Sequence, residues 1–338
     1  MRRALVAALV LAGCLPSSQK ETDRSLAPGD SASLARADAA PVDTLQRVWT
    51  ARAPESDPMA IPTTLAWWDD VLAVVETQNG SVRVFDDAGA YRRRIDLGLE
   101  GAFPYLAGVR GDTVVVLARG LDALVWVTDA GVARRVAVPP STAALATPER
   151  LAVRVGGGAS DAPAEVLTIG DGGAVRARAA LAGPAWRASG FLRAWGDTVL
   201  ALSGYRPVVD VVAPGARPDT LALDGFASPQ FARSAQFMRG DADEPPLLTS
   251  SAAALGRRLF VLNLRGDHVR VDVYGRDGVL ERALVSPRPW APTDAVPLDL
   301  AVRQRGAATE IAVLEARPPG ILSGPESRVV LYRWRPSS

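Results

Sequence analysis

The sequence predicts an all-β fold, a six-bladed β-propeller, and three observations favour it. Short apolar runs rich in Val, Leu and Ile recur from residue 44 onward, bounded by Gly, Asp or Pro, a pattern typical of β-strands. The runs form a repeated unit, and the corresponding residues Phe85 and Trp126 are 41 positions apart, close to the roughly 40 residues of a propeller blade. Finally, the last unit lacks one strand, while an unassigned strand-like run precedes the first unit.

Each unit is expected to be a four-stranded antiparallel meander. In the first copy, residues 71–75 and 81–85 form two strands, and the turn at 86–89 leads to a further strand at 91–97. Glycine in this turn permits the positive φ that tight hairpins need. Short runs that end at Asp69-Asp70, Gly111-Asp112 and Gly196-Asp197 supply an additional strand ahead of the corresponding units.

The ends of the repeat predict how the ring closes. The sixth unit stops after the run at 327–334, whereas residues 44–49 form a strand-like run with no unit of their own. If this N-terminal strand completes the last blade, it covers an edge that would otherwise be exposed. Seven blades, or two separate β domains, are the alternatives that the repeat leaves open.

One insertion between the fourth and fifth units predicts a short helix. Ser228-Pro229 supplies an N-cap and a first-turn proline, and Gly240 supplies a C-terminal glycine. The apolar residues Phe231, Phe237 and Met238 are expected to face the propeller.

The N-terminal segment predicts export and membrane anchoring. Residues 1–13 combine two arginines with an apolar run that is shorter than the roughly 20 residues of a membrane-spanning helix, which is typical of a signal peptide. The run ends in Leu11-Ala12-Gly13-Cys14, which resembles the bacterial lipobox and implies lipid on Cys14. Cys14 is the only cysteine, so it cannot form an internal disulfide. An ordinary secretory signal with an incidental cysteine is the alternative.

The chain is therefore expected to comprise a signal peptide at 1–13, a disordered tether at 14–42 and a propeller at 43–338. The tether prediction rests on polar composition without a hydrophobic period. Leu15 follows the cysteine in place of the aspartate that retains many lipoproteins at the inner membrane. We therefore expect the outer membrane, with the propeller facing the periplasm or the cell surface.

The turns and strand starts of the repeat resemble those of NHL-like six-bladed propellers of exported bacterial proteins, over residues 44–335. The resemblance implies that connections from second to third strands, and from one unit to the next, share one face, the loop face, where ligands bind. The candidate binding residues at this face are Glu76, Arg119, Tyr205, Arg206, Asn263, Arg265, Phe231 and Met238. His268, the only histidine, is added to them and is expected to be solvated at a strand end, because the alternating valines after it take the buried side.

These features favour a binding or scaffolding module for a peptide, glycan or protein partner. Lys and Arg number 38 against 37 Asp and Glu, so no basic surface points to nucleic acid. No catalytic constellation is found, and no cofactor is predicted. The alternative is a metal-dependent hydrolase or lyase similar to the propeller lactonases, with Glu76 and Asn263 as oxygen ligands for calcium.

Overall fold

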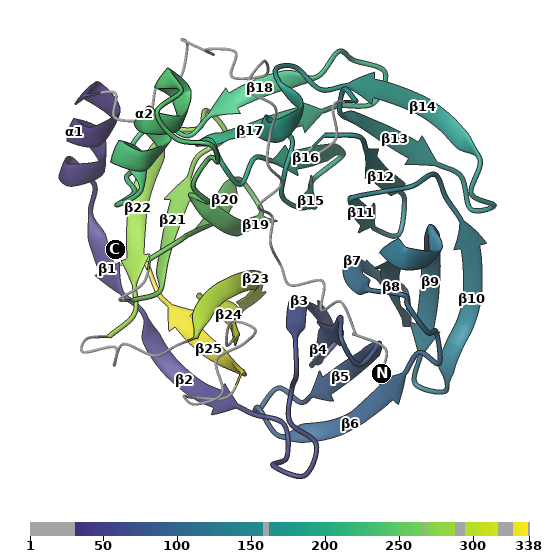
Figure 1. Ribbon diagram of the computed structural model, residues 1–338. Coiled ribbons are helices and arrows are strands. Elements are labelled where there is room, and N and C mark those ends of the chain that lie inside the picture. The colour runs from purple at the N-terminus through teal and green to yellow at the C-terminus, as the bar shows by residue number, and fades with distance from the viewer. Residues whose placement is uncertain (1–30, 158–161, 266–267, 288–294, 317–326, 337–338) are drawn as a thin grey trace.

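The computed structural model describes residues 31–157, 162–265, 268–287, 295–316 and 327–336, and these residues form mostly β-sheet. Within them the strands form five sheets that surround a common centre in a propeller-like arrangement (Figure 1). The predicted all-β class and propeller-like architecture are confirmed at this level. No helix among the described residues is both long and apolar enough to cross a membrane.

Neighbouring strands in sequence pair in antiparallel meanders. The first sheet consists of β3 (Pro62–Trp68), β4 (Val71–Glu76), β5 (Ser81–Phe85) and β6 (Tyr91–Asp96). The eight-stranded sheet contains two meanders. The first of these is β7 (Pro104–Arg110), β8 (Thr113–Ala118), β9 (Ala123–Thr128) and β10 (Gly131–Ala137). The second is β11 (Ala143–Ala146), β12 (Leu151–Val155), β13 (Glu165–Ile169) and β14 (Val175–Ala180).

Three further sheets complete the arrangement. One consists of β15 (Leu192–Trp195), β16 (Thr198–Leu202), β17 (Val208–Val212) and β18 (Asp219–Ala222). The five-stranded sheet contains β19 (Thr249–Leu255), β20 (Arg258–Asn263), β21 (Arg270–Tyr274), β22 (Leu280–Val285) and β1 (Val42–Thr44). The last contains β23 (Val296–Arg305), β24 (Ala308–Ala316), β25 (Arg328–Trp334) and β2 (Gln46–Ala51).

The eight-stranded sheet exists because two inner strands meet. Ala146 of β11 pairs in parallel with Gly108 of β7, and this is the single register pair between the two meanders within the described residues. A Cβ on Gly108 would lie 2.1 Å from the Ala146 carbonyl oxygen, so only glycine allows this approach.

The N-terminal chain joins two sheets at the rim. As the sequence predicted, an N-terminal strand pairs antiparallel with β25, although over Gln46–Ala51 and not 44–49. The parallel pairing of β1 with β22, in which Val42 lies opposite Ala283, was not predicted. The chain therefore crosses from the five-stranded sheet to the last one.

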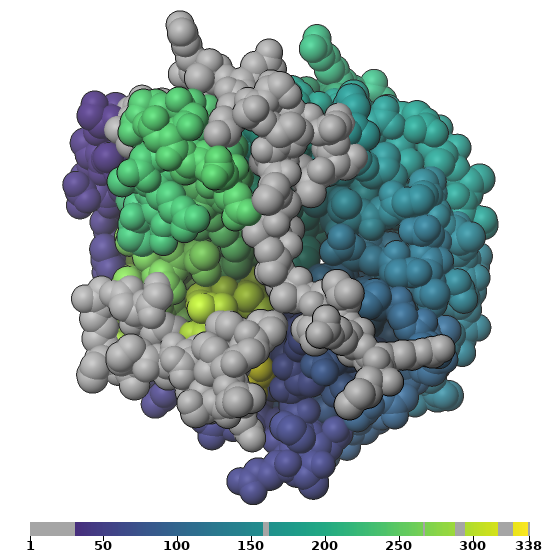
Figure 2. All heavy atoms as spheres, in the orientation of Figure 1, coloured from purple at the N-terminus to yellow at the C-terminus, as the bar shows by residue number. Residues whose placement is uncertain are grey.

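The predicted tether is wrong over residues 31–42, while residues 14–30 lie outside the described part. Residues 31–39 form α1 (Ser31–Ala39), whose Arg36 forms a 2.7 Å ion pair with Asp224. The Ser33 hydroxyl accepts a hydrogen bond from the Gly225 amide at 2.9 Å. Figure 2 shows α1 against the rim of the β-structure. The segment lacks a strong apolar stripe, but its alanines favour helix and polar contacts hold it in place.

The core lies between adjacent sheets, so both faces of a sheet are buried. Leu72 and Val74 of β4 pack towards the last sheet, and Ala73 and Val75 pack towards the neighbouring meander. Because successive side chains point to opposite faces, two covered faces produce a continuous apolar run and not an alternating one.

The predicted inserted helix is confirmed as α2 (Phe231–Arg239). It begins later than expected, since Gln230 is its N-cap and the Ser228 hydroxyl accepts a 3.1 Å hydrogen bond from the Gln230 amide. Gly240 ends it in a left-handed conformation with φ of 88°, as the C-terminal glycine predicted.

Candidate functional site

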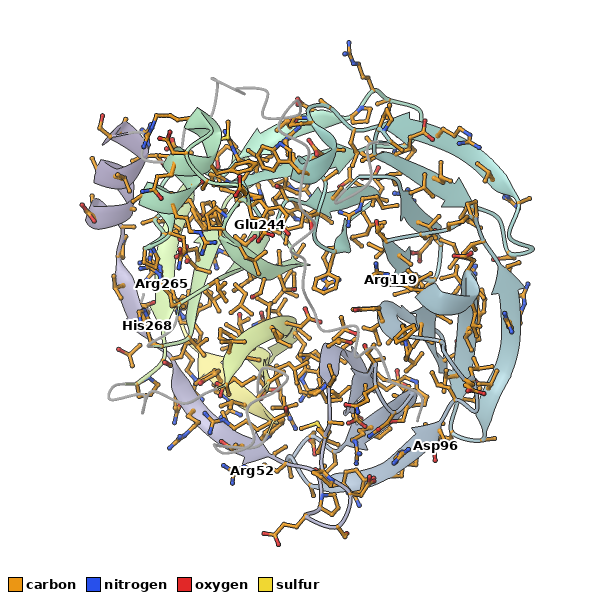
Figure 3. The ribbon with its side chains drawn as sticks, viewed as in Figure 1. Arg52, Asp96, Arg119, Glu244, Arg265 and His268 are labelled. Carbon is orange, nitrogen blue, oxygen red and sulfur yellow. The ribbon has the colours of Figure 1, made fainter. Side chains whose placement is uncertain are left out.

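The topology places the elaborate connections on one face of the molecule. In an antiparallel meander, the second and fourth strands end on the same side, so the loops that follow them share that side. This is the loop face, and it carries the 3₁₀ helices η3 (Arg119–Leu121) and η4 (Ala185–Arg187), together with α2. Figure 3 shows Arg119 and Glu244 near the centre, whereas Arg265 and His268 lie farther out.

Two arginines at this face are close enough for the charge of one to influence the other. Arg119 of η3 is exposed, and its guanidinium lies 5.1 Å from the centre of the Tyr105 ring, a cation–π contact. Arg154 of β12 is 3% exposed, and it donates from Nε to Thr142 Oγ1 at 3.1 Å and from Nη2 to the Gly190 carbonyl at 2.6 Å. Burial, with a contribution from the charge of Arg119, lowers the pKa of Arg154 to about 10.

An aromatic cluster lies beneath α2. The Trp186 ring is 5.0 Å from Phe237 and 6.5 Å from Tyr205, and burial raises the pKa of the Tyr205 hydroxyl. Arg206 donates from Nη1 to the sulfur of Met238 at 3.3 Å. The structure thus brings the predicted residues Tyr205, Arg206 and Met238 together, but Tyr205 and Arg206 are buried.

Asn263 and Arg265 form a second predicted group near the start of α2. Both donate to the Ala227 carbonyl, at 2.8 Å from Asn263 Nδ2 and 2.7 Å from Arg265 Nη2. Asn263 also donates to Asp272 at 2.7 Å, and desolvation raises the pKa of Asp272. The remaining candidate on α2, Phe231, packs against Phe226 with the rings 5.8 Å apart.

Glu76, a candidate of the loop face and of the calcium site, does not point at the central axis. Glu76 is fully buried and accepts hydrogen bonds from the Ala60 amide at 2.8 Å and the Ser81 hydroxyl at 2.9 Å. It also forms an ion pair with the buried Arg83. Glu76 is in step with Leu72 and Val74, so its side chain faces the last sheet and not the centre.

The expectation that His268 is solvated is also wrong, because His268 is 6% exposed. The alternation that suggested a polar, solvated face was real, but Asp272 and Tyr274 on that face are fully buried as well. A neighbouring sheet covers each face of β21, so alternation does not identify a solvent side here.

The described residues contain no group of three His, Cys, Asp or Glu side chains arranged to hold a metal ion. Glu76 and Asn263, the proposed calcium ligands, belong to different sheets and each is hydrogen-bonded within its own surroundings.

A buried polar network between inner strands was missed by sequence reasoning. Asp299 of β23 is fully buried and accepts hydrogen bonds from the Leu65 amide of β3 at 2.9 Å and from Arg193 of β15 at 2.7 Å. It also accepts from the Ser251 hydroxyl of β19. One carboxylate therefore joins four inner strands, and the only sequence signal for it is an acid within an apolar run.

Other contacts continue this network. The Leu106 amide of β7 donates to Thr64 Oγ1 of β3 at 2.8 Å, and Arg193 Nε donates to the Ala252 carbonyl of β19 at 2.9 Å. Along the sequence of inner strands, β3, β7, β11, β15, β19 and β23 each contact the next, and β23 contacts β3.

Arg154 was also missed as a candidate. Its signal was an arginine inside the apolar run of β12, at the strand end that corresponds to Glu76 and Asn263. Because arginine is the main basic residue throughout this chain, that signal did not stand out in the sequence.

No known family model and no curated protein sequence matches this chain. Its structure resembles that of a catalytically inactive virginiamycin B lyase from Staphylococcus aureus with quinupristin, at a TM-score of 0.54 and 9% identity, covering 85% of this chain and 98% of that one. Regucalcin, a calcium-binding protein from Agrobacterium tumefaciens, has a TM-score of 0.56 and 12% identity, covering 87% of this chain and 95% of its own. PQQ-bound aldose sugar dehydrogenase from Streptomyces coelicolor has a TM-score of 0.50 and 12% identity, covering 86% of this chain and 98% of its own. At these identities the likeness establishes the propeller fold alone.

Proposed function

We propose that this chain is an exported, lipid-anchored β-propeller that binds a peptide, glycan or protein partner at its loop face. The observation that supports this most directly is the asymmetry of the two faces. On the opposite face, five of the described turns between first and second strands are only two residues long, at 69–70, 111–112, 196–197, 256–257 and 306–307. The loop face carries η3, η4 and α2 instead, and loops elaborated on a rigid scaffold are where binding usually occurs.

The proposal includes six blades of NHL-like type. It treats the eight-stranded sheet as two blades that touch through Ala146 and Gly108. The cycle of contacts among the six inner strands supports that count. The pairing of β2 with β25 supports closure of the ring by the N-terminal strand.

The anchor is the part of the proposal that rests on sequence alone. It depends on the lipobox-like segment that ends at Cys14 and on the absence of any second cysteine. Lipid at Cys14 would tether the propeller to a membrane. Because Leu15 and not aspartate follows the cysteine, we propose the outer membrane. The loop face would then be available to partners in the periplasm or outside the cell.

Glycan and peptide arrays probed with the mature protein test the binding proposal. Arg119→Glu changes an exposed side chain of the loop face, and Arg178→Glu is a matched control on the outer strand β14. We expect array signals that the first variant loses and the second retains. Signals that are equal in both variants and the wild type would locate binding elsewhere and contradict the proposal.

The alternative function is a metal-dependent hydrolase or lyase, which is favoured by the likeness to a lyase and to a calcium-binding propeller. In that case Asn263 would contribute its side-chain oxygen, a buried atom without a hydrogen bond in the described chain. A rise in melting temperature with millimolar calcium that Asn263→Ala abolishes would favour this alternative over simple binding.

A further inference from the structure

Arg154 differs from the buried arginines that have carboxylate partners. Arg187 pairs with Asp210 at 2.8 Å, and Arg83 pairs with Glu76 and Asp57. Among the described residues, Arg154 donates hydrogen bonds only to neutral oxygens, those of Thr142 and Gly190. Its third nitrogen, Nη1, is buried and has no hydrogen-bond acceptor in the described chain.

No carboxylate of the described residues forms an ion pair with Arg154. Asp210 is close enough to influence Arg154, but its Oδ1 already accepts hydrogen bonds from Arg187 and Thr220, both at 2.8 Å. The nearby Arg119 adds a second positive charge. An unpaired charge away from water is costly unless an opposite charge reaches it, so an anion from outside the chain would be stabilised here.

The guanidinium of Arg154 is held in one orientation before any ligand arrives. Thr142 accepts from Nε and Gly190 from Nη2, and Nη1 is the one guanidinium nitrogen with no acceptor among the described residues. Thr142 and Gly190 are themselves half-buried, so the group lies just below the surface of the loop face. A donor fixed in this way loses little conformational entropy on binding.

We propose that Arg154 and Arg119 form a subsite for an oxyanion, a carboxylate or phosphate group carried by the ligand. This inference rests on the proposed binding function and names the chemistry that the loop face recognises. The exposed Arg119, held over Tyr105, attracts the anion, and Arg154 Nη1 donates a charge-assisted hydrogen bond to it.

Thermal melting with inorganic phosphate and with acetate tests the subsite, against sodium chloride at equal ionic strength. We expect a saturable rise in melting temperature for the wild-type protein with at least one of the two anions. A response to phosphate alone assigns a phosphate group, and a response to acetate alone assigns a carboxylate.

Variants show whether the two arginines cause the response. Arg154→Met retains most of the side-chain length without the charge, and it should abolish the rise in melting temperature with the anion. Arg119→Ala should weaken the apparent affinity by roughly tenfold, the lower end of the effect of a charge that attracts the ligand electrostatically. Arg178→Ala, at an exposed arginine paired with Glu165, should leave it unchanged.

A wild-type protein that responds to neither anion would overturn the subsite, as would an unchanged affinity in Arg154→Met. If Arg154→Met does not fold, Arg119→Ala decides the question, because Arg119 is exposed and an unchanged affinity there would overturn the subsite equally. Array ligands that still bind the loop face in such a case would leave the proposed function intact.

Discussion

At the scale of single residues, buried arginines organise the segments around them. Arg83 is fully buried and pairs with Glu76. It also donates hydrogen bonds to both carboxylate oxygens of Asp57, from Nη1 to Oδ2 at 2.9 Å and from Nη2 to Oδ1 at 3.0 Å. These contacts hold the connection between β2 and β3 against the first sheet. The hydrogen bond from Arg83, more than any other favourable contact, lowers the pKa of Asp57 below its usual value.

The pair predicts a pH-dependent contribution to stability. Since the pKa of Asp57 is lower in the folded than in the unfolded chain, its contribution is complete above about pH 4 and is lost as the pH falls through the folded value. At neutral pH, Asp57→Asn should cost at most about 1 kcal/mol, because the Asp57 side chain is 36% exposed. Thermal unfolding at a series of pH values should show the variant and wild type converging in acid.

The matched control is Asp129→Asn, because Asp129 pairs with Arg93 at an exposed site and is 68% exposed itself. We expect little effect from it at any pH. A stability difference for Asp57→Asn that stays constant from neutral to acid pH would show that the loss does not come from this ionisation.

At the scale of elements, the strands follow from the sequence better than the side-chain directions do. The inner strands β11, β19 and β23 were not located from the sequence. Turns with Asp and Gly mark many other strand ends, so most of the remaining strands, like α2, were predicted close to their observed bounds. The orientations of Glu76 and His268 were not, because each sheet is covered on both faces and alternation alone cannot say which neighbour covers which face. α1 was not predicted because its sequence has no apolar period, and contacts with other parts of the chain hold it in place.

The contact between β7 and β11 gives a test at this scale. In Gly108→Ala the new methyl would meet the Ala146 carbonyl oxygen, so the two inner strands must separate. We expect a loss of about 1–3 kcal/mol in the free energy of unfolding, measured by denaturant titration. Gly172→Ala is the control, because a methyl group on Gly172 would meet no atom within 4 Å beyond its own chain neighbours. Equal losses in the two variants would mean that the close approach is absent.

At the scale of the whole molecule, the loop face is a single surface only if the ring closes. The site residues come from different sheets: Arg154 belongs to the eight-stranded sheet, Arg119 lies in η3 between two strands of that sheet, and Asn263 belongs to the five-stranded one. The sequence predicted closure from an incomplete last unit, and the structure pairs β2 with β25. The sequence could not predict β1, because this three-residue strand at the rim is not part of the repeated unit.

A disulfide between β2 and β25 tests closure most directly. Thr50 lies opposite Val330, and facing residues in antiparallel strands are about 4.5–5.5 Å apart at Cα, within the range that a disulfide spans. With Cys14 replaced by serine, Thr50→Cys and Val330→Cys would be the only cysteines. We predict an intramolecular disulfide that migrates faster on a non-reducing gel and raises the melting temperature, an effect that reductant reverses. Cysteines that stay reduced, or that form only intermolecular dimers, would contradict a ring closed by the N-terminal strand.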